Sequence, residues 1–152
     1  MLGKANVALI AFASALLIGA GPATRLNPAS EITYTASLTG LEQVTSAART
    51  AGDPDGAGMV RLTVDPERKR ICYDFRLSGL STPLMAHIHR GPAFRNGPSV
   101  VTLFTGPGGD PDHCLDWTRE RLAEIVSDPT NFYVNLATTE FPDGALRGQL
   151  QG

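Results

Sequence analysis

The chain has 152 residues, with 13 Lys and Arg against 15 Asp and Glu and a formal net charge of −2 at pH 7. That length accommodates one domain with a modest hydrophobic core. The longest basic run, Arg68-Lys69-Arg70, has acidic residues before it and indicates a hairpin turn, so we expect no nucleic-acid surface, which needs several cations on one face.

The first residues are typical of a secretory signal peptide. A positive start precedes an apolar run from Ala5 to Ala20, and small residues follow, so cleavage is expected after Ala20 or Ala23. The run is short for a membrane-spanning helix, and an uncleaved anchor is the alternative. We therefore expect an exported protein, periplasmic or secreted, with no membrane span after cleavage. The expected organisation is a signal peptide over 1–23, a short linker over 24–30 and one domain over 31–152.

Apolar residues alternate with polar ones along most of the remaining chain, which is the period of half-buried β-strands. The alternation predicts strands over 32–39, 60–64, 71–77, 84–88, 99–104, 132–136 and 146–150. The segment 106–114 is rich in Gly, Pro and Asp and is expected to be a loop, while a 3.6-residue period predicts one short helix near 118–127. These elements predict an all-β fold, either an antiparallel immunoglobulin-like β-sandwich or a Greek-key barrel.

Two cysteines, Cys72 and Cys114, lie in the predicted domain. An even count in an exported protein favours a disulfide, which closes a loop of roughly 40 residues here. The alternative is a nucleophilic Cys114 assisted by its neighbour His113. Adjacent residues of an extended chain point to opposite faces, so that geometry is poor and the disulfide is preferred.

Two of the three histidines, His87 and His89, lie one residue apart in a predicted strand. Residues i and i+2 of a strand share a face, so both imidazoles and Met85 are expected on one side. Ala86 and Ile88 point the other way, and their apolar character marks that side as the core. The histidines are therefore expected on the outer face, beside the Gly- and Pro-rich segment that follows.

Three interpretations of this pair remain open. The imidazoles hydrogen-bond to the loop backbone, or they bind copper or zinc with the Met85 thioether and His113 as further candidate ligands. Acid–base catalysis is the third interpretation, but neither a nucleophile nor a paired acid accompanies the histidines at a recognisable spacing.

Two other segments, 53–56 and 110–112, carry carboxylates. Their sequences are typical of turns, with a calcium loop as the alternative.

Several segments resemble the CHRD domain, the module named after chordin. The segments that carry the resemblance are LTGLEQV (38–44), ICYDFRLSGL (71–80), AHIHRGP (86–92), NGPSVVTLF (96–104) and FYVNLATTEFPDGALRGQL (132–150). The resemblance covers about residues 31–151 and implies a secreted antiparallel β domain that is immunoglobulin-like or barrel-like. It implies no defined enzymatic activity, and the growth-factor partners of chordin do not transfer to this chain.

One departure from the family pattern bears on metal binding. Family members commonly have histidine where this chain has Ala137, so a metal site that uses that histidine has lost a ligand here. A strand with two histidines also invites comparison with copper/zinc superoxide dismutase, an analogy at the level of fold alone. Such an enzyme needs more than three histidines, so a reduced copper-only redox site is the remaining enzymatic alternative.

The sequence thus predicts a non-enzymatic binding or structural module with an extracytoplasmic partner. Its contact surface is expected at the end of the fold formed by 85–98 and 135–144, and Arg147 is expected to form a buried ion pair or to brace the end of the chain. A copper- or zinc-binding protein is the second hypothesis. The expected binding-loop residues are Arg90, Gly91, Asn96, Gly97 and Asn135.

Overall fold

The computed structural model describes residues 31–44 and 52–152. The predicted signal peptide and linker lie outside these ranges. The strands are β1 (Ile32–Thr39), β2 (Ala57–Asp65), β3 (Arg70–Ser78), β4 (Pro83–Arg90), β5 (Ser99–Thr105), β6 (Asp112–Asp116), β7 (Phe132–Thr138) and β8 (Leu146–Gln149). The helical elements are η1 (Gly40–Glu42), α1 (Arg119–Ser127) and η2 (Pro129–Asn131).

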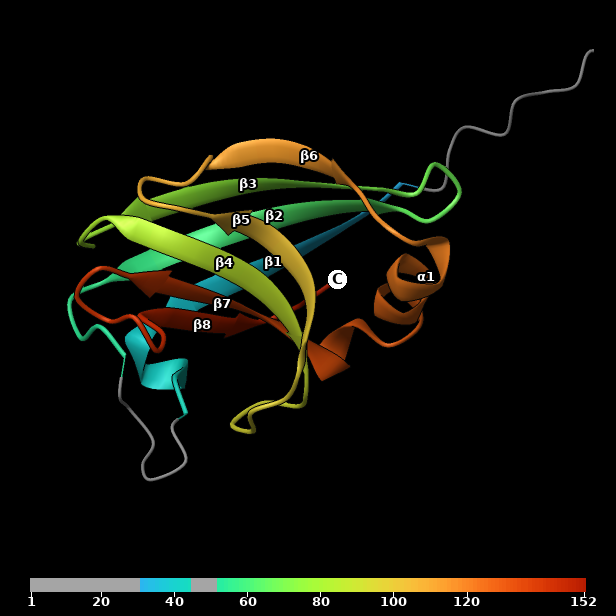
Figure 1. Cartoon of the computed structure of the whole chain (residues 1–152). Coiled ribbons are helices and arrows are strands. Elements are labelled where there is room, and N and C mark those ends of the chain that lie inside the picture. The colour runs from blue at the N-terminus through green and yellow to red at the C-terminus, as the bar shows by residue number, and fades with distance from the viewer. Residues whose placement is uncertain (1–30, 45–51) are drawn as a thin grey trace, which may run out of the picture.

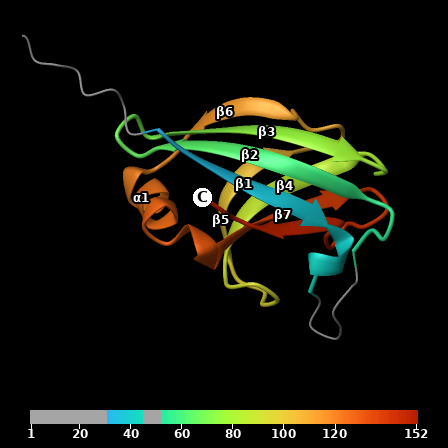
Figure 2. The same ribbon diagram turned by 180° about the vertical axis from the view of Figure 1, so that it is seen from behind.

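The strands form one continuous antiparallel sheet in the order β5-β4-β7-β8-β1-β2-β3-β6. The sheet curls around a shared interior and makes a nearly closed barrel (Figures 1 and 2). The all-β prediction is confirmed, and of its two architectures the barrel is the one observed. The two edge strands, β5 and β6, border the open seam.

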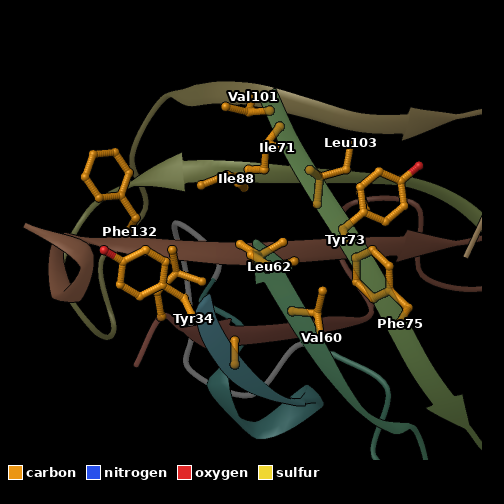
Figure 3. Close-up of a cluster of buried hydrophobic side chains, with 14 of the residues drawn as sticks. Tyr34, Val60, Leu62, Ile71, Tyr73, Phe75, Ile88, Val101, Leu103 and Phe132 are labelled. Atoms are coloured by element: carbon orange, nitrogen blue, oxygen red, sulfur yellow. The ribbon is translucent and has the colours of Figure 1, made fainter. Parts of the chain in front are cut away.

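The barrel interior is filled by the apolar residues that alternate along the strands. Val60, Leu62 and Val64 of β2 are fully buried, and each such side chain contributes about 1.5–3 kcal/mol on leaving water. Figure 3 shows side chains from β1 to β5 and β7 converging on this space. Phe104 of β5 meets Phe75 of β3 with ring centroids 5.8 Å apart, so aromatic packing bridges the seam from inside.

The predicted helix is present as α1. Thr118 caps its start, because the threonine hydroxyl accepts a hydrogen bond from the backbone N–H of Arg121 at 3.3 Å. Leu122 and Ile125, on one helical face, are fully buried in the hydrophobic core. The helix itself lies at one end of the barrel (Figure 1). In the described part of the chain, no helix has the length and apolar character needed to cross a membrane.

The segment expected as a loop over 106–114 is corrected in its last three residues, because β6 begins at Asp112. This edge strand is short and four of its five residues are exposed, so it lacks the apolar alternation by which strands are recognised. Cys114 of β6 lies directly opposite Cys72 of β3, and the two form the predicted disulfide on the outer face.

Candidate functional site

The β4 strand carries both histidines on its outer face, as the alternation predicts. Ala86 and Ile88 are fully buried in the core, whereas His87 and His89 are half-buried on the other face. The two imidazole rings lie edge to face with their centroids 5.8 Å apart. Met85, on the same face, is also half-buried.

His89 begins a row of polar side chains that crosses β4, β7 and β8. It pairs in register with Tyr133, and the two rings are nearly parallel with centroids 5.0 Å apart. Arg147 of β8 completes the row, since its Cζ lies 3.5 Å from the centroid of the Tyr133 ring. The arginine is only 1% exposed, and a desolvated cation–π contact contributes about 2 kcal/mol.

Arg147 holds the loop over 91–98 that joins β4 to β5. Its guanidinium donates hydrogen bonds to the carbonyl oxygens of Pro92 at 3.0 Å and Arg95 at 2.9 Å, and to Asn96 Oδ1 at 3.2 Å. No carboxylate pairs with it among residues 31–44 and 52–152. The arginine therefore acts as a brace rather than half of an ion pair, and what it braces is this loop.

Further hydrogen bonds fix both ends of the loop. His89 Nδ1 lies 3.0 Å from the Gly97 carbonyl oxygen, and the Gly97 N–H donates to the Tyr133 hydroxyl at 3.1 Å. Gln149 Nε2 donates to the Gly91 carbonyl oxygen at 2.8 Å. Glycine is required at 97, because a Cβ there would lie 1.6 Å from a backbone carbonyl oxygen of β4.

The tip of the loop is strained. Phe94 has a φ of 62°, in the left-handed region that bulky residues rarely adopt, and its side chain is 43% exposed. Such a conformation costs about 1–3 kcal/mol and persists only where the surroundings impose it. The carbonyls held by Arg147 lie on either side of it, at Pro92 and Arg95.

The loop also contacts the segment that follows β1. Asn96 Nδ2 donates to the Val44 carbonyl oxygen at 2.6 Å, and Gln43 Nε2 donates to Asn135 Oδ1. Between these contacts lies a polar cleft of about 260 Å³. It is lined by Gln43, Val44, His89, Asn96, Gly97, Tyr133, Asn135 and Asp143.

The surroundings favour neutral imidazoles. Burial lowers the pKa of His89, and the nearby Arg147 charge lowers it further, while the Gly97 hydrogen bond partly opposes them. Burial and the neighbouring His89 lower the pKa of His87. Because a carbonyl only accepts, His89 Nδ1 carries the proton and Nε2 the lone pair; Nε2 is buried with no hydrogen-bond partner in the described part of the chain.

We therefore expect the unfolding free energy to fall as the pH drops below 6.5, the ordinary histidine pKa. The unfolded chain takes up protons there before the folded protein does, so this contribution is complete above pH 6.5 and is lost towards the lower folded pKa values. Urea unfolding from pH 7.5 to 5 measures it. The His87→Gln/His89→Gln variant should show a flatter dependence, and an unchanged slope would contradict the assignment.

The other predicted metal ligands lie in two places. Met85 is opposite Ala137, so a histidine at 137 would stand beside the pair. His113 is on β6, where its ring centroid is 6.5 Å from that of Tyr73 and its Nδ1 is 3.4 Å from Asp110. No three His, Cys, Asp or Glu side chains gather as a metal-binding group in the part of the chain that the structure describes.

Tyr133, Gln43 and Gln149 are site residues that the sequence interpretation missed. Tyr133 was detectable in part, because its position in the alternation of β7 places it outward with Asn135. It is buried yet lies outside the hydrophobic core cluster, which is the mark of an outward residue covered by a loop. Gln43 and Gln149 have no such signal, since their partners are distant in sequence.

Comparison with known proteins gives one match. The family model of the CHRD domain matches residues 34–150. No curated protein and no solved structure matches the chain.

Proposed function

The chain belongs to the CHRD domain family, and on that premise we propose that it is an exported, non-enzymatic module that binds an extracytoplasmic partner. The contact surface is the braced loop over 91–98 together with Arg90 and Asn135. The predicted signal peptide and the disulfide support an oxidising compartment outside the cytoplasm.

One observation carries this proposal: a fully buried arginine fixes an exposed loop in a strained conformation. Burying a guanidinium costs free energy, and here its hydrogen bonds hold loop carbonyls on both sides of Phe94. A loop fixed before contact loses little conformational entropy on binding, which is the advantage of a preorganised surface. An aromatic and an arginine, Phe94 and Arg95, are residue types that dominate interface energies.

Site-specific photo-crosslinking tests the surface. A photoreactive phenylalanine analogue replaces Phe94 in one protein and Met59, which is also 43% exposed, in the control. With the exported proteins of the source organism, we expect a discrete adduct from position 94 only, and excess unlabelled protein should abolish it. The purified partner should then bind the Arg147→Lys variant about tenfold more weakly. Equal adducts from both positions would contradict the proposal.

A second candidate is copper or zinc binding by His87 and His89, with Met85 as a further ligand. It is favoured by the lone pair of His89 Nε2, which is buried without a partner while Nδ1 bonds to a carbonyl, the arrangement common in metal-ligating histidines. His113, which the sequence offers as a further ligand, lies on β6 opposite Tyr73 and is left out of this ligand set. A copper-only redox site is the enzymatic form of this candidate.

Titration of the tag-free protein with Cu(II) and Zn(II) separates the two candidates. Metal binding predicts micromolar or tighter affinity that is lost in the His87→Ala/His89→Ala variant and kept in His113→Ala. The single His87→Ala variant is included because this ring makes no hydrogen bond within the described residues, so its loss should leave the loop intact. Equal weak binding by all the proteins would refute the metal candidate.

A further inference from the structure

A second hollow lies where the β2–β3 turn meets the start of α1, away from the loop over 91–98. Its volume is about 570 Å³, within the range of about 300–1,000 Å³ typical of small-molecule clefts. Trp117, the one tryptophan of the chain, forms part of its wall. The lining residues are Arg68, Lys69, Asp116, Trp117 and Thr118.

The two walls of the hollow are fixed relative to each other. Trp117 packs partly against the hydrophobic core, and its backbone N–H donates to the Lys69 carbonyl oxygen at 2.8 Å. Next to it Asp116 pairs in register with Arg70 of β3. The indole is half-buried, so part of it stays accessible from the hollow.

The charged side chains that line the hollow differ in whether they are already held in ion pairs. Arg68 is held by Asp65 at 3.1 Å and by Glu31 at 3.5 Å. Lys69 and Asp116, in contrast, are exposed and form no side-chain ion pair in the described part of the chain. The hollow therefore offers one uncommitted ammonium group and one uncommitted carboxylate beside an aromatic surface.

We propose that this hollow binds a pyranose saccharide. An indole presents an apolar surface to the C–H face of a sugar ring, while Asp116 accepts hydrogen bonds from its hydroxyl groups and Lys69 donates to them. Because uncommitted groups of both signs line the same hollow, a strongly anionic or cationic ligand is disfavoured and a neutral one rich in hydroxyl groups is suited to it. The site stands apart from the loop over 91–98 and does not depend on the function proposed above.

Intrinsic fluorescence provides a direct test, because all tryptophan emission of this chain comes from Trp117. The full protein is titrated with chitotetraose, cellotetraose and maltotetraose, and calorimetry measures the same binding independently. We expect a saturable change in Trp117 emission with at least one of the three sugars, and a calorimetric Kd that agrees with it. No saturable signal by either method with any of the sugars would overturn the proposal.

Variants distinguish this hollow from a site elsewhere. Asp116→Ala and Lys69→Gly change exposed side chains, and glycine suits the φ of 56° at position 69, so both proteins should remain folded. We expect Asp116→Ala and Trp117→Phe each to weaken calorimetric binding about tenfold, while Leu41→Ala, a change at an exposed residue outside the hollow, leaves it unaltered. Sugar binding that none of the hollow variants weakens would overturn the proposal.

Discussion

Replacing Arg147 with alanine should lower the unfolding free energy by about 3 kcal/mol, although the residue lies in no catalytic or hydrophobic motif. The change removes the cation–π contact with Tyr133 and leaves the carbonyl oxygens of Pro92 and Arg95 without their donors. It also empties a fully buried volume on the outer face of β8. Urea unfolding monitored by Trp117 fluorescence measures the loss.

Two further variants assign the effect to geometry and burial rather than to charge. Arg147→Lys keeps the charge but replaces the planar fork with a single ammonium group, so it should recover only part of the loss. Arg76→Ala removes a largely exposed arginine paired with Asp74, and surface changes of this kind usually stay within about 0.5 kcal/mol. If Arg147→Ala were no more destabilising than Arg76→Ala, the bracing role would be wrong.

The braced loop should also respond to the Arg147 variants in a local way. Without the guanidinium, the carbonyl oxygens of Pro92 and Arg95 lose their donor, and Gln149 of β8 still holds the loop only at Gly91 among the contacts described above. The strained φ of Phe94 should then relax. Amide hydrogen exchange should therefore accelerate over residues 91–97 in Arg147→Lys before it changes in β2. Equal acceleration everywhere would indicate a global loss of stability instead.

Sequence patterns predict well where the determining contacts are local. The alternation in Val60, Leu62 and Val64 identifies β2 and its inward face, because in a strand the direction of each side chain follows from its position alone. The same argument places His87 and His89 outward. Choosing between a sandwich and a barrel requires knowing which strands are neighbours, and pairings such as β4 with β7 join residues far apart in sequence.

The contacts of the candidate site are equally hard to predict from sequence, because they join residues that are far apart along the chain. The sequence leaves Arg147 as either half of a buried ion pair or a brace for the end of the chain. Its actual partners, Pro92 and Arg95, lie more than fifty residues away, and no local pattern points to them. His113 is a second residue whose neighbours in the fold cannot be inferred from the sequence around it. Its candidacy as a metal ligand rested on composition, and the register of β6 with β3 places it opposite Tyr73.

Loss of the disulfide between Cys72 and Cys114 is expected to have the largest effect on the stability of the protein. Reduction, or the Cys72→Ser/Cys114→Ser double variant, should lower the unfolding free energy by about 3–4 kcal/mol and the Tm by roughly 10–20 °C. The bridge spans a sequence separation of 42 and restricts the unfolded chain accordingly. It also attaches β6, whose residues are mostly exposed and which pairs with no strand other than β3 among the described residues.

A local effect on β6 distinguishes the attachment of this strand by the disulfide from the general entropic effect of the disulfide on the unfolded chain. Hydrogen bonds to β3 and the half-buried Leu115 are the main remaining attachments of β6 once the bridge is cut, so the edge strand should open before the rest of the barrel. Hydrogen exchange in reduced protein should be fastest over 112–116 and along β3, with β1 and β2 protected until global unfolding. The Thr63→Ser variant, at the outward position paired with Cys72 on β2, serves as a control that should leave exchange in β6 unchanged. If oxidised and reduced protein unfolded at the same urea concentration, neither the entropic nor the local part of this argument would hold.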